Sequence, residues 1–378
     1  MKVVVAIDSL KGSLTSMEAG NAIRRGIQKA YPDTEVVVKP LADGGEGTTE
    51  ALVEGLGGEM IQVEVHGPLE APVQASYGII HETGTAVMEM AAAAGIILVG
   101  KDKRPLDATT YGVGEMIRDA VQRGCRNFIM GIGGSATNDG GTGMLEALGY
   151  EFLDEKGMPV GLGAKVLKDI VQVRTDHAMP ELKECNFQIA CDVTNPLCGT
   201  NGATWIYGPQ KGVTGGMRDD LDEALGSFAE VTKACTGTDF AQAEGAGAAG
   251  GLGFAFLSYL NGDLKPGIDL VLKAVKMEEA MQDADLVFTG EGRLDEQTAM
   301  GKAPTGIAKL AKKHGAKVVA LAGCIADGAE KCNEEGIDAY FPILRQIITL
   351  DEAMEPETAA ENMERTAEQV FRLAVSMR

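Results

Sequence analysis

The chain is poor in the residues that build disulfides, thiolate metal centres and histidine-based sites. Its 378 residues include only 7 cysteines, which form no CxxC pair, and 4 scattered histidines. An odd set of separated cysteines is typical of reduced thiols in the cytoplasm, and scattered histidines argue against a zinc site. These absences predict a cytoplasmic protein without structural disulfides.

Positive charge is also scarce. The chain carries 34 lysines and arginines against 55 aspartates and glutamates, so its net charge is -21. A protein without a basic patch is not expected to bind nucleic acid or an anionic membrane surface. The first apolar stretch ends at Asp8, too early for a signal peptide, and the run at residues 91–99 is too short to cross a bilayer. We therefore expect small molecules as ligands, bound by a few cations in loops.

Glycine, by contrast, is abundant at 50 residues, roughly twice its usual frequency, and it clusters in short motifs. The richest motif is GIGGSATNDGGTG at residues 131–143, which follows an apolar run and precedes a helix-like run. A strand, a glycine-rich loop and a helix in this order let backbone N–H groups converge on an anion. No GK[ST] ends the loop, so it is not a Walker A motif. It predicts a phosphate- or polyol-binding loop of another kind.

The order of strand patterns predicts a doubly wound α/β domain made from both ends of the chain. Residues 3–7 and 35–39 are continuous apolar strands of the parallel type, and Thr15 and Glu18 have capping-box spacing at the start of the helix between them. Parallel α/β character returns at residues 284–288, with a further strand at 317–321. A tandem arrangement of two domains is the alternative.

The middle of the chain has a different character and predicts an inserted domain. Residues 61–65, 73–80 and 85–90 are typical of antiparallel or mixed strands. Residues 186–212 contain further strand-like pieces, among them ATWIY at 203–207. We therefore expect a mixed sheet in this part.

Acidic residues in glycine-rich turns follow four of the predicted strands. In α/β sheets ligands bind outside the carboxyl ends of the strands, so these turns are candidate site loops. Carboxylates that hold Mg²⁺, cations that neutralise phosphate charge and a carboxylate that orients a hydroxyl are the requirements of phosphoryl transfer. The acids are Asp8, Asp43, Asp192 and Glu291 with Asp295, and the cations on the same or nearby loops are Lys11, Lys211, Arg293 and Lys302.

One familiar pattern does not indicate a dinucleotide site. Gly245, Gly247 and Gly250 match GxGxxG, but no convincing strand precedes them and no acidic residue follows at the required distance. The run at residues 245–253 instead predicts close helix packing or a hinge. Without this context, and without an obvious histidine base, a nicotinamide-dependent dehydrogenase is not favoured.

Taken together, these motifs resemble the bacterial glycerate kinase family, of the type called glycerate kinase I. The resemblance extends over essentially the whole chain. It rests on DSLKGSLTS (8–16), ADGGEGTTEAL (42–52), GIGGSATNDGGTGMLEALG (131–149), ACDVTNPLCG (190–199), YGPQKG (207–212), GAGAAGGLGFA (245–255), LKPGID (264–269) and TGEGRLDEQTAMGKAP (289–304).

The resemblance implies an ATP-dependent kinase that phosphorylates D-glycerate to 2-phosphoglycerate and needs Mg²⁺. It implies a flavodoxin-like domain of residues 1–64 and 285–378, an inserted mixed α/β domain of residues 65–284, and an active site in the cleft between them. The protein would be a monomer or a homodimer. A 3-phosphoglycerate product, another small hydroxy acid as substrate, and a non-catalytic two-lobed sensor are the alternatives.

Joined to this resemblance, the loops suggest a role for each candidate residue. Asp192 is expected to accept the hydroxyl proton, Lys11 and Arg293 to contact phosphates or the substrate carboxylate, and Glu291 with Asp43 to hold Mg²⁺. The residues expected to bind substrate or phosphate are Ser9, Asp43, Gly133, Gly134, Ser135, Asn138, Asp139 and Gly290.

Overall fold

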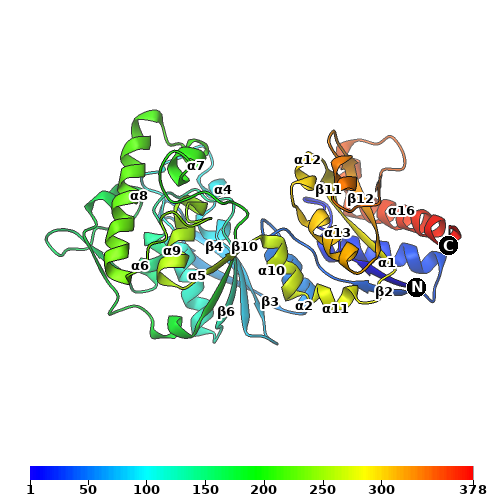
Figure 1. The fold of residues 1–378 in the computed structure, drawn as a ribbon, viewed down its shortest axis with the longest axis horizontal. Coiled ribbons are helices and arrows are strands. Elements are labelled where there is room, and N and C mark those ends of the chain that lie inside the picture. The colour runs from blue at the N-terminus through cyan, green and yellow to red at the C-terminus, as the bar shows by residue number, and fades with distance from the viewer. Residues whose placement is uncertain (378) are drawn as a thin grey trace. The chain divides into compact units, whose positions relative to one another are not determined.

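The computed structural model describes residues 1–377, which form two compact units (Figure 1). Unit 1 consists of Met1–Asp43, Glu50–Gly57 and Ile268–Arg378, and unit 2 of Gly44–Thr49 and Gly58–Gly267. No helix among the described residues has both the length and the apolar character needed to cross a membrane.

Unit 1 is built on a five-stranded parallel sheet with the strand order β13-β12-β11-β1-β2. Numbered by their own order in the chain, these strands run 2-1-3-4-5, which is the flavodoxin-like order. The order reverses between β1 and β11, and this reversal is the topological switch point. The strands are β1 (Lys2–Val5), β2 (Glu35–Val38), β11 (Leu286–Leu294), β12 (Lys317–Ile325) and β13 (Ala339–Pro342).

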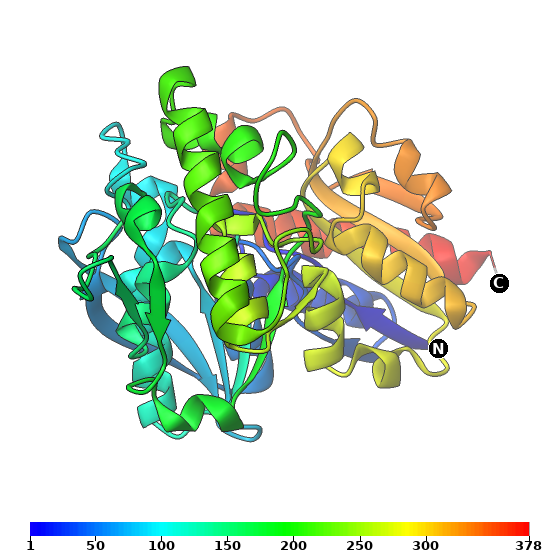
Figure 2. The same ribbon diagram turned by 60° about the vertical axis from the view of Figure 1, so that its left-hand side comes forward.

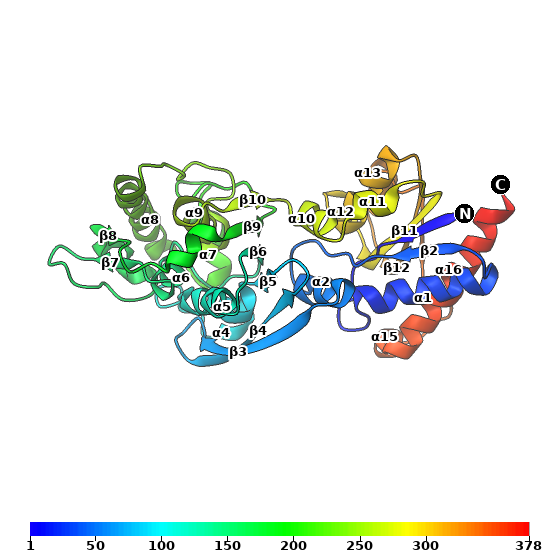
Figure 3. The same cartoon turned by 90° about the horizontal axis from the view of Figure 1, so that it is seen from below.

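Helices cover both faces of this sheet. The helices α1 (Ser16–Ala30) and α16 (Pro356–Ser376) pack together on one face, whereas α11 and α13 lie on the other (Figure 3). The predicted capping box at the start of α1 is confirmed, since Glu18 N donates to Thr15 Oγ1 and Thr15 N donates to Glu18 Oε2. The remaining helices are α2 (Thr48–Leu56), α10 (Gly267–Ala274), α11 (Met277–Met281), α12 (Glu296–Ala299), α13 (Ala303–Lys313), α14 (Lys331–Glu334) and α15 (Leu350–Met354).

Unit 2 contains a mixed six-stranded sheet with the order β10-β9-β6-β5-β4-β3. The strands β10, β9, β6 and β5 are parallel, whereas β5, β4 and β3 form antiparallel pairs. The short strands β7 and β8 pair with each other. The bounds are β3 (Glu59–His66), β4 (Pro72–Ile80), β5 (Thr85–Glu89), β6 (Asn127–Gly131), β7 (Glu151–Leu153), β8 (Gln172–Arg174), β9 (Asn186–Ala190) and β10 (Asp263–Lys265).

The helices of unit 2 include α8 (Gly215–Thr236), the long green helix in Figure 2. Its residues Leu225 and Phe228 are buried in the core of this unit. The others are α3 (Ala91–Ala94), α4 (Ile96–Val99), α5 (Tyr111–Gln122), α6 (Thr142–Ala147), α7 (Ala203–Lys211) and α9 (Leu252–Tyr259), with the 3-10 helices η1 (Ala164–Asp169), η2 (Pro180–Glu184) and η3 (Ala248–Gly250).

The predicted architecture, a flavodoxin-like sheet from both chain ends and a mixed sheet in between, is confirmed. Three segments lie in a different unit from the one expected. Residues 44–49 belong to unit 2, where the amides of Gly47 and Thr49 donate to Glu89. Residues 58–64 also belong to unit 2, because β3 pairs with β4 along its whole length. Residues 268–284 belong to unit 1, where Ile268 lies directly against Gly306 of α13. The strand pattern placed both boundaries at changes of sequence character, whereas packing decides them.

The strand predicted at residues 203–207 is wrong, because this segment is the first half of helix α7. Threonine, tryptophan, isoleucine and tyrosine favour strands, but such preferences are weak and depend on context. Gly212, with φ +96°, ends the helix and donates its amide to Gly208 O. The functional consequence is that Thr204 and Lys211, seven residues apart, come to the same face of a helix.

Candidate active site

The first cluster of predicted residues lies at the switch point of unit 1. Asp8 follows β1, and its amide donates to Gly290 O of β11 at 2.9 Å. Gly290 has φ +145°, and a Cβ there would lie 1.7 Å from Leu321 O, so only glycine fits. Gly290, expected to bind substrate, is thus a buried strand residue that positions Asp8 through its backbone.

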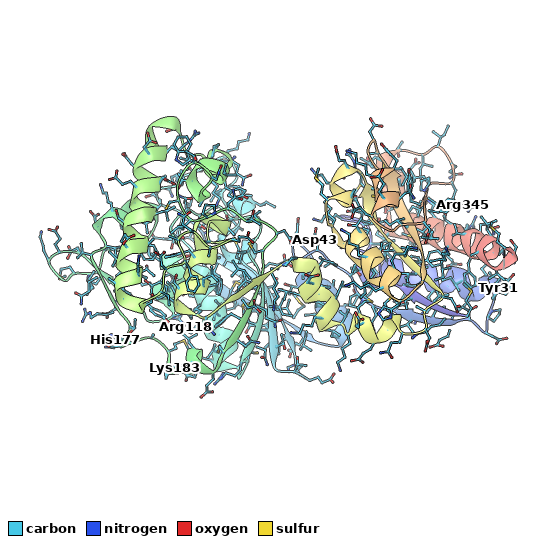
Figure 4. The ribbon with its side chains drawn as sticks, in the orientation of Figure 1. Tyr31, Asp43, Arg118, His177, Lys183 and Arg345 are labelled. Carbon is cyan, nitrogen blue, oxygen red and sulfur yellow. The ribbon has the colours of Figure 1, made fainter. Side chains whose placement is uncertain are left out.

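Asp8 lies in a strongly acidic environment. Burial and the negative charges of Asp43 and Glu291 together raise its pKa to about 7, although the Ser9 amide and Lys11 oppose the shift. Ser9 N donates to Asp8 Oδ1 at 2.7 Å. The structure therefore brings together Asp8, Asp43 (labelled in Figure 4), Glu291 and Lys11, from three separate loops or strand ends.

Glu291 is held by its own hydroxyl donor. Thr298 Oγ1 of α12 donates to Glu291 Oε1 at 2.6 Å. Burial raises the pKa of Glu291, the Thr298 hydroxyl and Lys302 lower it, and the charges of Asp295 and Asp43 raise it. Asp295 itself caps α12 through Gln297 N and Thr298 N. The carboxylate of Glu291 is therefore oriented, and its second oxygen is left for other interactions.

The donor set at the switch point suits a hard divalent cation. Carboxylate oxygens are the protein ligands that Mg²⁺ prefers, and a cation would relieve the mutual repulsion that raises the pKa of Asp8. Within residues 1–377, however, no three acidic, histidine or cysteine side chains form a ready-made metal cage.

The two predicted cations of this unit are exposed. Lys11 lies on the surface near Asp8, whose pKa it lowers. The Arg293 side chain is 67% exposed and its Nε lies 3.5 Å from Asp295 Oδ2. An exposed ion pair of this kind contributes little to stability, about 0–1 kcal/mol. The Arg293 side chain can therefore turn toward an anionic ligand at low cost.

The second cluster lies at one edge of the sheet in unit 2. The register aligns Glu89 of β5 with Gly131 of β6, Gly131 with Ala190 of β9, and Ala190 with Lys265 of β10. These strands are parallel, so the segments that follow them leave from the same edge. The 131–143 loop and Asp192 thus follow neighbouring strands, which lie about 4.8 Å apart.

The front of the 131–143 loop, formed by Gly133, Gly134 and Ser135, offers three backbone N–H donors. Gly133 and Gly134 are exposed, Ser135 is 8% exposed, and within residues 1–377 none of their three amides donates a hydrogen bond. Gly134 has φ +72°, the conformation that turns successive amides into one concavity. Two bonds hold this turn in place, from Ile96 N to Gly134 O and from Ala136 N to Ala94 O. The arrangement suits an oxyanion.

Asn138 and Asp139 lie behind this front and are fully buried. Asp139 accepts hydrogen bonds from Thr110 N and Oγ1, both at 2.8 Å, and from the amides of Gly141 and Gly143. Asn138 Nδ2 donates to Thr204 Oγ1 at 2.9 Å. Both residues were expected to bind substrate, but their contacts are those of residues that hold the loop.

Asp192 is exposed, and one of its oxygens is already oriented. Gly267 N, the first amide of α10, donates to Asp192 Oδ1 at 3.0 Å. A carboxylate at a helix N-terminus is stabilised in its charged form. Asp192 is therefore oriented at the edge of the sheet from which the turn of Gly133, Gly134 and Ser135 also leaves.

Glu89 is a residue of this edge that the sequence interpretation missed. Its carboxylate accepts from Thr49 N at 3.0 Å and from Gly47 N at 3.4 Å, and so caps the start of α2. The sequence feature that could have identified Glu89 is an acidic residue at the end of a strand, as at Asp8 and Asp192. It was overlooked because the residues after it, MAAAAG, do not form a glycine-rich turn.

Replacement of Glu89 by alanine should destabilise the GGEGTT segment at residues 44–49. Loss of a helix-capping carboxylate costs about 0.5–2 kcal/mol, so the urea midpoint should fall while the m-value stays constant. Glu64→Ala, an exposed acid of β3, is the matched control and should change the free energy of unfolding by less than about 0.5 kcal/mol. Equal midpoints for the two variants would show that Glu89 does not stabilise the segment.

Comparison with known proteins places this geometry in a family. Residues 3–375 match the Glycerate kinase family profile. Glycerate kinase from Bacillus subtilis (strain 168) is 47% identical over 98% of this chain and 97% of the relative, and glycerate 2-kinase from Escherichia coli (strain K12) is 45% identical over 100% and 99%. A crystal structure from Salmonella typhimurium LT2, assigned as glycerate kinase 2, has a TM-score of 0.92 at 41% identity and covers 100% of this chain and 98% of that one.

Proposed function

Since the chain belongs to the glycerate kinase family, we propose that it transfers the terminal phosphoryl group of ATP to the 2-hydroxyl of D-glycerate. It is a kinase, a phosphotransferase with an alcohol group as acceptor. The specific product is supported by the name of the Escherichia coli relative, glycerate 2-kinase. Mg²⁺ as the required cation is part of the same proposal and is supported by the carboxylates of unit 1.

The proposal rests on the turn of Gly133, Gly134 and Ser135 in unit 2, whose amides can bind an oxyanion. This turn follows β6, and Asp192 follows the neighbouring strand β9. A molecule with a carboxylate and a hydroxyl on the adjacent carbon matches such a pair of groups. The glycerate carboxylate would accept hydrogen bonds from the amides of Gly133, Gly134 and Ser135. The hydroxyl would lie near Asp192, whose carboxylate would accept its proton as the new O–P bond forms and the bond to the ADP oxygen breaks.

The switch point of unit 1 is assigned to the phosphates of ATP and their metal. Asp8, Asp43 and Glu291 would hold Mg²⁺, which when bound neutralises charge on the transferring phosphoryl group. Lys11 and Arg293 would add positive charge at the phosphate oxygens, Lys11 as a point charge and Arg293 through its planar fork of donors. Ser9 keeps Asp8 oriented through its amide.

Phosphorus NMR of the product tests activity, substrate and position of phosphorylation at once. With D-glycerate, ATP and Mg²⁺ we expect ADP and a phosphomonoester signal whose proton coupling identifies attachment at C2. A signal coupled to the C3 methylene protons would instead establish 3-phosphoglycerate as the product. ADP release only with another small hydroxy acid would change the substrate, and binding without ADP release would make the protein a sensor.

A further inference from the structure

Lys211 is a buried cation that the proposed chemistry does not use. It is the last residue of α7, and it is only 2% exposed. Its Nζ donates a hydrogen bond to Thr137 O at 2.7 Å. Burial lowers the pKa of Lys211 to about 7, and the charge of Asp139 opposes that shift. An ammonium group removed from water in this way is costly, so its position calls for a reason.

Helix α7 contacts two consecutive residues of the glycine-rich loop from behind. Lys211 binds the carbonyl of Thr137, and the hydroxyl of Thr204 accepts from the side chain of Asn138 at 2.9 Å. The two α7 residues are two helical turns apart and so project from one face. Thr137 Oγ1 and Asn138 Oδ1 are buried and have no hydrogen-bond partner within residues 1–377. The bonds from α7 therefore carry much of the polar support of this stretch.

The same stretch of loop is also packed closely against η3. A Cβ on Gly250 would lie 2.1 Å from Thr137 O and 2.6 Å from Asn138 Cα, so the two backbones are in close contact. Gly140 N also donates to Gly250 O at 2.9 Å. Residues 137–140 are therefore in contact with both η3 and α7.

We propose that Lys211 is a positioning residue, which with Thr204 holds Thr137 and Asn138 and thereby fixes the three amides of Gly133, Gly134 and Ser135 on the front of the loop. Amides can bind an oxyanion strongly only if they converge before the ligand arrives. The part of the inference that concerns catalysis rests on the proposed function. The part that concerns the loop does not, and it can be measured without any turnover.

The test compares Lys211→Met with the wild-type full-length chain by hydrogen–deuterium exchange. Methionine keeps the length and apolar stem of lysine but cannot donate to Thr137 O. We expect exchange in peptides covering residues 136–143 to accelerate about tenfold or more, while exchange in α8 is unchanged. Steady-state kinetics should show the KM for D-glycerate rising about tenfold, with a smaller change in the KM for ATP.

Thr204→Val provides a second, charge-neutral test in case Lys211→Met fails to fold because Asp139 is left as an unpaired buried charge. It removes one hydroxyl at constant shape, and it should shift loop exchange and the glycerate KM in the same direction by about threefold or more. The matched control is Lys233→Met, whose ammonium forms an exposed ion pair with Asp239 at 2.9 Å and should leave both readouts unchanged.

The outcomes separate the inference from the proposed function. Faster loop exchange in both α7 variants, in a chain that shows no glycerate kinase activity, would support the loop role and reject the activity. Normal loop exchange and normal KM in a folded Lys211→Met or Thr204→Val chain would overturn the positioning role, even if the wild-type protein is a glycerate kinase.

Discussion

Replacement of Asp8 by asparagine is expected to stabilise the protein while it removes most of its activity. Asp8 is buried beside Asp43 and Glu291 at the switch point, where its pKa is raised from 3.8 to about 7. Asparagine keeps the shape and the acceptor for Ser9 N but removes the charge that would bind Mg²⁺. We expect kcat/KM to fall by about a factor of 10³ or more, as is typical for loss of a group that stabilises charge in the transition state.

The gain in stability follows from the sign of the pKa shift. Between pH 4 and 7 the folded state keeps a proton on Asp8 that the unfolded state releases, so the free energy of unfolding of the wild type falls as the pH rises. The destabilisation that the Asp8 charge causes is complete above pH 7 and absent below pH 4. At pH 8 the Asp8→Asn variant should therefore be more stable by about 2–4 kcal/mol, measured by urea unfolding without metal or nucleotide.

Asp33→Asn, an exposed acid in the turn before β2, should alter neither activity nor the pH dependence of stability. At pH 8 Mg²⁺ should stabilise the wild type more than Asp8→Asn, because the wild-type carboxylate is charged and binds the cation. An Asp8→Asn variant that is less stable than wild type at pH 8 would contradict the picture of repelling carboxylates.

Asp192→Asn is expected to bind MgATP normally but to turn over slowly. Asparagine can still accept from Gly267 N, so the start of α10 should stay in place. It cannot accept the proton of the substrate hydroxyl, and general-base contributions are typically 10²–10⁴-fold. We therefore expect kcat to fall by about that factor in a coupled ADP-release assay, with little change in the KM for ATP.

Asp222→Asn separates this chemical role from a structural one. Asp222 of α8 accepts from Gly199 N on the polar loop that also carries Asp192, and it has no place in the proposed chemistry. Its replacement should change kcat less than about threefold. A near-normal kcat for Asp192→Asn, or equal losses for the two variants, would reject Asp192 as the base.

The local parts of this fold could be predicted from sequence. Buried parallel strands are continuous apolar runs, and the capping box of Thr15 and Glu18 is a pattern of four residues, so both depend on neighbours along the chain. The doubly wound sheet followed from finding such strands at both ends, and its flavodoxin-like type was implied by the resemblance to the family. The segment at 203–207 failed because its strand preference is outweighed by packing of α7.

The candidate site likewise has features that the sequence predicts and features that only tertiary contacts decide. The chain by itself determined that acids follow the strands at Asp8, Asp43 and Asp192, and that a glycine-rich loop follows β6, because a strand end and its turn are contiguous residues. Glu291, also expected in a turn, lies within β11. Only the tertiary structure decided that Gly133, Gly134 and Ser135 form the open front of that loop while Asn138 and Asp139 are internal. Asp139, Asn138 and Thr137 find their partners Thr110, Thr204 and Lys211 at 29, 66 and 74 positions away along the chain, and no local pattern specifies which distant donor will be buried against which acceptor.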